Sequence, residues 1–200
     1  MLYESLEILR EQVANYLEEM GLGSNIVVLD SIAHFIDNTN RDNEPLDNKV
    51  ILSLLNLQEE TALKNQRNYT IEAGKPVYRN APVNLNAYIL FTCNRSDYAF
   101  SLRSLASIIS FFQGKNSFNH KNTLFSRNTQ VMQSVTEFQF TTELFTPSFE
   151  ELNYIWSMLG GKAYPAAMYK LNIIKLQREH IQDEGALLTQ VHTQYNQITS

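Results

Sequence analysis

The chain has 200 residues, 44% of them hydrophobic, and a formal net charge of −5 at pH 7. A chain of this length buries about 70% of its unfolded surface, which is enough for one domain that needs no metal or disulfide. The acidic balance, without a cluster of about five lysines and arginines, argues against a nucleic-acid partner, and the lack of an apolar run near roughly 18 residues argues against a membrane span.

The first 20 residues predict an amphipathic helix. Apolar residues recur at helical spacing from Leu2 to Met20, with glutamates between them, and Gly21 follows as a helix stop. A signal peptide would not carry these glutamates, so we expect a mature sequence in the cytoplasm. A β-branched strand is expected at Asn25 to Ile32, followed by a polar surface loop at Asp37 to Asp47.

Two stretches are apolar on both faces of a strand, which is typical of the interior of a sheet. They predict central strands at Lys49 to Leu57 and at Leu85 to Cys93. The polar connection between them, Thr61 to Val83, carries only a weak strand signal at Tyr69 to Ile71. Cys93 is the only cysteine, and its apolar strand predicts a buried core residue rather than a nucleophile.

A helix is expected next, from about Asp97 to about Gln113. Ser96 is placed to cap its first backbone donors, and Gly114 is placed as a left-handed stop. The apolar stripe of this helix consists of Tyr98, Leu102, Leu105, Ile109 and Phe112, and Ile108 and Phe111 widen it.

The C-terminal half begins with a polar loop, Lys115 to Asn128, which three apolar residues could pin to the body: Phe118, Leu124 and Phe125. Alternation then predicts a strand over Gln130 to Leu144. Thr146 to Glu151 has the composition of a helix start, Trp156 lies on the apolar stripe that follows, and Gly160 and Gly161 end it.

A last strand is predicted at Ala166 to Leu176. We therefore expect a domain over residues 1–176 and a polar tail over residues 177–200. Helices and strands do not alternate strictly, so the fold class expected is α/β of the α+β type, a mixed sheet with helices packed on it.

No catalytic, cofactor or metal site is predicted. The four histidines are scattered, with no two at a spacing that suits a metal pair. Helix capping explains Ser96 and Asp97, and the Glu59–Glu60 pair is either a solvated strand end or a contact surface. An enzyme would need a site assembled from residues distant in sequence.

Four segments together resemble a known family: MLYESLEIL at residues 1–9, NKVILSLLNLQEE at 48–60, PVNLNAYILF at 82–91 and FEELNYIWSMLGGKAYPAAMYK at 149–170. They are similar to the tail-terminator or tube-cap family of phage-tail-like contractile injection systems, in particular to the N-terminal domain of the Pvc-type cap. The resemblance covers about residues 1–176.

The resemblance implies a non-enzymatic protein that forms a six-membered ring on the baseplate-distal end of the inner tube. It also implies that this ring ends tube growth and connects the tube to the sheath, with other copies, the tube protein and the sheath protein as partners. The particle would assemble in the cytoplasm.

Loops and strand ends are expected to make the ring contacts, because a closed ring repeats one heterologous patch. An acidic strand end would face a basic turn of the next subunit. The candidate interface residues are Glu59, Glu60, Lys64, Lys162 and Tyr164. Two alternatives stay open: a small-molecule enzyme of mixed α/β fold with a dispersed site, and a monomeric adaptor that binds by strand augmentation.

Overall fold

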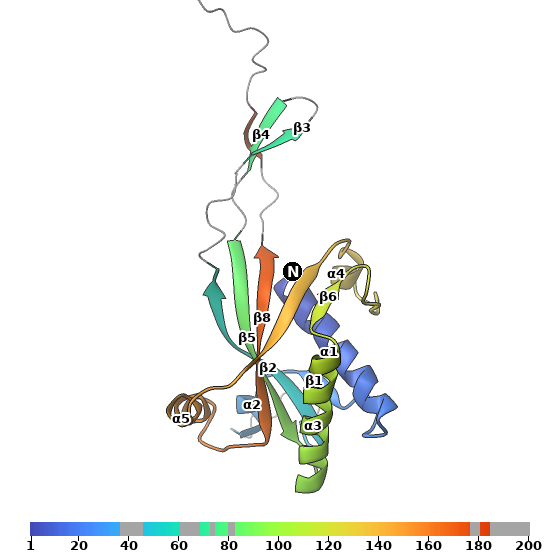
Figure 1. Ribbon diagram of the computed structural model, residues 1–200, viewed down its shortest axis with the longest axis vertical. Coiled ribbons are helices and arrows are strands. Elements are labelled where there is room, and N and C mark those ends of the chain that lie inside the picture. The colour runs from blue at the N-terminus through green and yellow to red at the C-terminus, as the bar shows by residue number, and fades with distance from the viewer. Residues whose placement is uncertain (37–45, 61–68, 73–74, 80–82, 177–180, 185–200) are drawn as a thin grey trace, which may run out of the picture.

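The computed structural model describes residues 1–36, 46–60, 69–72, 75–79, 83–176 and 181–184. Its main element is a six-stranded sheet with the order β1-β2-β5-β8-β7-β6 (Figure 1). β1 and β2 are parallel, and the other neighbours are antiparallel, which confirms the mixed sheet. The strands are β1 (Val27–Leu29), β2 (Lys49–Glu59), β5 (Val83–Asn94), β6 (Ser117–Asn119), β7 (Gln139–Phe145) and β8 (Ala166–Leu176).

Both predicted central strands lie inside this sheet. β5 runs between β2 and β8, and neighbouring side chains such as Leu90 and Phe91 are buried on opposite faces. β2 pairs with β1 only along Val50 to Leu52. Beyond the residues paired with β1, Leu54 and Leu57 are each 39% exposed. The apolar character of β2 on both faces therefore predicts its interior position but not the exposure of its second half.

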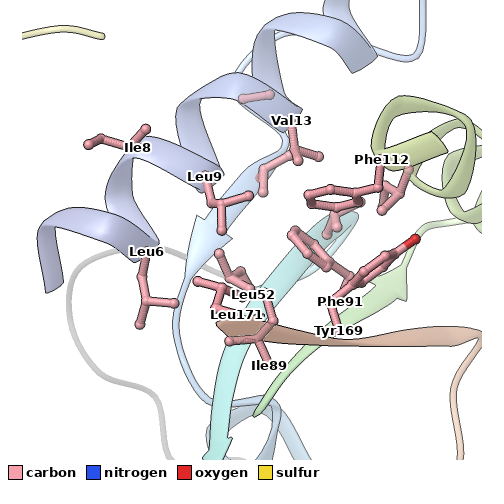
Figure 2. Packing of buried hydrophobic residues seen from close by; sticks show 14 of the residues in the cluster. Leu6, Ile8, Leu9, Val13, Leu52, Ile89, Phe91, Phe112, Tyr169 and Leu171 are labelled. Atoms are coloured by element: carbon pink, nitrogen blue, oxygen red, sulfur yellow. The ribbon is translucent and has the colours of Figure 1, made fainter. Parts of the chain in front are cut away.

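α1 (Leu2–Glu19) covers one face of the sheet, as its periodicity predicts. Leu9 and Val13 point from it towards Phe91, Tyr169 and Phe112 (Figure 2). The helix ends in a glycine stop of the expected kind: Gly21 has a positive φ, its N–H donates to the Glu18 carbonyl at 2.9 Å, and the next N–H donates to Leu17.

α3 (Tyr98–Gly114) packs on the same face, with Ile108 and Phe112 of its predicted, widened stripe buried and the rest of that stripe partly or largely exposed. The side chains that face the body are Ser101, Ser104, Ile108 and Phe112, whereas Tyr98, Leu102 and Ile109 of the predicted stripe are exposed. The helix is apolar around most of its circumference, so its periodicity does not determine which side is buried.

The predicted ends of α3 also need correction. Asp97, rather than Ser96, is the N-cap, and its carboxylate accepts from the Ala99 N–H at 3.2 Å. Gly114 does not have the left-handed conformation expected of a helix stop. Lys115 follows in an extended conformation and its N–H donates to the Phe111 carbonyl, so the chain leaves the helix without that glycine geometry.

α5 (Phe149–Met158) covers the other face of the sheet. Ser148 and Glu151 form a capping box, and Gly160 and Gly161 end the helix with positive φ angles. Trp156 is 7% exposed and packs with Leu90 and Met168, which confirms its burial. Leu90 and Met168 directly precede Phe91 and Tyr169, which belong to the core under α1 and α3. Because neighbouring residues of a strand alternate, Leu90 and Met168 point to the opposite face of the sheet.

The stretch predicted as one strand over 130–144 is a turn of helix followed by a shorter strand. α4 (Gln130–Gln133) begins at Thr129, whose hydroxyl accepts from the Met132 N–H at 3.3 Å. Met132 and Val135 are both buried in the same cluster. In a strand these two positions would face opposite sides, so the helical turn is what brings both into the core.

In the polar loop before α4, two of the three apolar residues predicted to hold it on the body do pack there. Phe118 is fully buried and stacks on Phe140, and Phe125 packs against the core. Leu124 is 92% exposed, which contradicts its predicted role. Its backbone carbonyl accepts from Gln12 Nε2 at 2.7 Å, so a hydrogen bond holds the loop there while the side chain points away.

A second, three-stranded sheet has the order β3-β4-β9, formed by β3 (Tyr69–Glu72), β4 (Lys75–Arg79) and β9 (Ile181–Glu184). β3 confirms the weak strand signal. β4 lies within the expected polar connection, and β9 lies within the expected tail. Figure 1 shows this sheet beyond the ends of β5 and β8.

The remaining elements are short. α2 (Ile32–Ile36) begins where the strand at 25–32 was expected to end, and β1 is shorter than that prediction. The Ile32 N–H donates to Ser53 Oγ at 3.2 Å, which fixes the start of α2 on β2. The polar loop predicted at 37–47 lies almost entirely outside the described residues. Within the described ranges, no helix combines the length and apolar character needed to cross a membrane.

Candidate interaction surfaces

The predicted interface residues lie at opposite ends of the main sheet. Glu59 ends β2 opposite Leu85, whereas Tyr164 precedes β8, whose first residue pairs with Thr92. Leu85 and Thr92 are separated by about 23 Å along an extended strand. The two predicted patches therefore do not meet within one subunit, as a head-to-tail contact between subunits requires. Lys64 lies outside the described residues.

The acidic end of β2 is only partly available for a contact. Glu60 is half-buried: its carboxylate accepts from Asn86 Nδ2 at 2.9 Å, and its N–H donates to the Asn84 carbonyl at 2.8 Å. Glu59 is exposed. Glu60 therefore helps to hold the end of β2 on β5, and Glu59 is the more accessible charge of the pair.

The turn after α5 likewise contains one half-buried and one exposed candidate residue. The ring of Tyr164 is half-buried, and its centroid lies 6.2 Å from that of Trp156. It belongs to the apolar layer under α5. Lys162 is exposed. Of the predicted basic turn, the lysine is thus the group that another molecule could reach most easily.

Two exposed apolar surfaces were missed by the sequence reasoning, which assigned the first of them to the apolar stripe of the helix. The α3 surface consists of Tyr98, Leu102 and Ile109, which are 66%, 45% and 40% exposed. The α5 surface consists of Tyr154 and Met158, which are 59% and 76% exposed. Phe149 is 93% exposed at the start of the same helix, on the side of Trp156. The signal available in the sequence was that both helices carry large apolar residues outside a single stripe.

Arg95 fixes the orientation of α3 from the turn that precedes it. Its Nη2 donates to the Leu22 carbonyl at 2.7 Å and its Nη1 to the Asn48 carbonyl at 2.9 Å. The Arg95 N–H donates to Ser101 Oγ at 3.3 Å. Partial burial lowers the pKa of the guanidinium from its ordinary value. These bonds tie the first turn of α3 to the segment after α1 and to the start of β2, which keeps Ser101 inward.

Cys93 lies in the core and has no environment that would activate it. Its side chain is 1% exposed, and burial raises the pKa of the thiol from 9.0 to about 12. The thiol therefore stays protonated at neutral pH, whereas the form that acts as a nucleophile or metal ligand is the thiolate. Within the part of the chain that the structure describes, no three histidine, cysteine, aspartate or glutamate residues gather to hold a metal.

A shallow polar hollow of about 280 Å³ lies between α1 and the segment at 126–132. Three of its charged groups have partners: Arg10 pairs with Glu7 at 2.6 Å, and Ser126 Oγ donates to Glu11 at 2.6 Å. These contacts attach the segment before α4 to α1. The hollow thus has a structural role in the packing of the two segments.

Two solved structures share this fold. The PVC sheath/tube terminator of an extracellular contractile injection system, in the extended state, matches 100% of this chain with a TM-score of 0.67 and 14% identity. The tube terminating cap of the anti-feeding prophage matches 92% with a TM-score of 0.57 and 12% identity. The chain spans 65% of the first protein and 60% of the second.

A comparison with curated proteins finds no match. The family model of the Pvc16 N-terminal domain, however, matches residues 6–190, which is most of the chain. This match agrees with the resemblance in the four sequence segments. The chain belongs to the Pvc16 N-terminal domain family.

Proposed function

We propose that this chain caps the inner tube of a contractile injection system and ends its growth. One observation carries the proposal: 100% of this chain matches part of a sheath/tube terminator, and 92% of this chain matches part of a tube terminating cap. Such a role is structural and needs contact surfaces rather than a catalytic pocket. The exposed apolar faces of α3 and α5 supply surfaces of that kind.

In this proposal the cap is a ring of six copies on the baseplate-distal end of the tube, and it joins the tube to the sheath. The partners are other copies of the chain, the inner tube protein and the sheath protein. Residues 1–176 form the ring-building domain, with 177–200 as a tail. The ring is assembled in the cytoplasm as part of a particle.

Electron microscopy of sheath–tube particles made with and without the protein tests the proposal. Without it we expect tubes of variable and excessive length, because nothing stops the addition of tube subunits. Supplying the protein in trans restores uniform length, and the variant Leu124→Ala, at a residue that is 92% exposed, serves as a matched control that also restores it. Tubes of normal, uniform length in its absence would refute the role of terminator.

The predicted polar contact has its own test. If Glu59 of one subunit meets Lys162 of the next, Glu59→Lys weakens ring closure without unfolding the domain, because both groups are exposed. Combining it with Lys162→Glu then restores closure, since the reversed charges again attract. Analytical ultracentrifugation of the wild type, Glu59→Lys and the double variant measures the effect. Equal ring formation by all three would rule this contact out.

A further inference from the structure

The exposed face of α3 carries a continuous apolar stripe. Tyr98, Leu102, Leu105 and Ile109 follow one another at spacings of four, three and four residues, so they lie along one side of the helix. Leu105 packs partly against the core, whereas the other three are between 40% and 66% exposed. Single exposed apolar residues are normal on a soluble protein, but a contiguous row marks a surface that another molecule covers.

α5 carries a second apolar surface on the opposite side of the molecule. Tyr154 and Met158 are one helical turn apart and face away from Trp156, and they are 59% and 76% exposed. α3 packs over the sheet face of Phe91, and α5 packs over the face of Leu90. Figure 1 accordingly shows the two helices on different sides of the sheet.

The charges on the two helices are opposite in sign. α3 contains no acidic residue, and its one basic side chain, Arg103, lies over the ring of Phe100 at 5.5 Å from the ring centroid. α5 contains no basic residue and carries Glu150 and Glu151 in its first turn. A contact of either helix with its own copy would therefore place like charges in the interface, whereas a contact between α3 and α5 pairs opposite ones.

We infer that the exposed face of α3 in one copy packs against the exposed face of α5 in the next copy. The inference rests on the proposed function and names the surfaces through which the copies of the cap bind one another. Because the two surfaces lie on opposite faces of one sheet, the contact is heterologous and continues from copy to copy, as a ring requires. The apolar stripes form its centre, and Arg103 and Glu150 contribute at its rim.

Cysteine cross-linking of the full chain, free and on sheath–tube particles, tests the contact. The single native cysteine is buried, so introduced surface cysteines are the reactive ones. In the variant Leu102→Cys/Met158→Cys, the two thiols lie on opposite faces of one chain, and a short bismaleimide can join them only between copies. We expect a ladder of covalent multimers, at least tenfold stronger than in Leu102→Cys/Leu124→Cys, whose second site lies outside α5.

Two further variants make the result decisive. Adding Ile109→Glu to the double-cysteine variant should reduce the ladder at least fivefold while circular dichroism remains unchanged. The pair Glu59→Cys/Lys162→Cys reports on the polar contact instead. A ladder from that pair together with none from α3 and α5 would overturn the inference, as would cross-linking of Leu102→Cys to the sheath or tube protein.

The outcomes separate this inference from the proposed function. Particles of controlled length that carry the protein at their ends, but show no α3–α5 ladder, would overturn the inference and leave the terminator role standing. A ladder from the free protein, combined with normal particles in its absence, would support the contact between copies and refute the terminator role.

Discussion

Replacing Trp156 with alanine should destabilise the domain by about 3 kcal/mol. Substitution of a buried tryptophan or phenylalanine by alanine costs about 3–5 kcal/mol, because transfer free energy is lost and a cavity is left. Trp156 is 7% exposed and packs with Leu90 and Met168, so it qualifies as a core side chain. We expect the lower part of that range because several neighbours, including Tyr164 and Leu159, are only partly buried and can move into the space.

Urea denaturation measured by far-UV circular dichroism is the suitable assay. Trp156 is the only tryptophan, so its fluorescence reports on unfolding of the wild type but is lost in the variant. Both proteins should show the same dependence of unfolding free energy on urea, with a lower midpoint for the variant. Asn153→Ala, at an exposed position of the same helix, is the matched control and should change stability by no more than about 0.5 kcal/mol.

A loss below about 1 kcal/mol for Trp156→Ala would refute the reasoning, because a change that small is typical of surface positions. It would mean that α5 does not pack on the sheet in solution. The α5 surface proposed for the contact between copies would then have to be reconsidered as well, since it depends on the same orientation of the helix.

Three further predictions concern single side chains. Arg95→Ala should lower the unfolding free energy by about 1–2 kcal/mol, because two backbone carbonyls lose a charged donor. It should also raise the rate of amide hydrogen exchange in α3. Unchanged exchange in α3 would contradict the role assigned to Arg95. Ser148→Ala should cost about 1 kcal/mol by removing the capping box of α5, whereas Ser148→Asp should retain most of the stability. The pKa of Cys93 is raised by burial from 9.0 to about 12, so its protonated thiol contributes stability that is complete below pH 9 and decreases between pH 9 and 12, as the unfolded chain loses its proton first. Cys93→Ala should show a smaller decrease over that range, and rapid labelling of native Cys93 by a thiol reagent at pH 7 would contradict its burial.

Much of the fold follows from local sequence patterns. Leu85 to Cys93 is apolar at neighbouring positions, and only a strand covered on both faces can bury such a sequence, so its central place follows without knowledge of its neighbours. The end of α1 at Gly21 and the capping box of α5 likewise depend on residues within one helical turn. These predictions succeeded because the interactions that decide them are local.

Other features depended on contacts that periodicity does not reveal. The second half of β2 extends beyond its pairing with β1, and Leu54 and Leu57 there are each 39% exposed. The predicted strand at 130–144 was wrong in its first part, because Thr129 starts a helical turn that brings Met132 and Val135 into one core. In both places the outcome depends on what lies beside the segment in space.

The sequence alone determined that α3 is a helix, because its apolar residues recur at helical spacing and Asp97 and Ser96 can cap it. Only the tertiary structure decided which side of that helix faces outward. Arg95 holds the first turn so that Ser101 points inward, and Ile108 and Phe112 then occupy the core while Leu102 remains exposed. A helix that is apolar around most of its circumference can bury either side, so its orientation is set by the contacts of its ends and by the shape of the sheet beneath it.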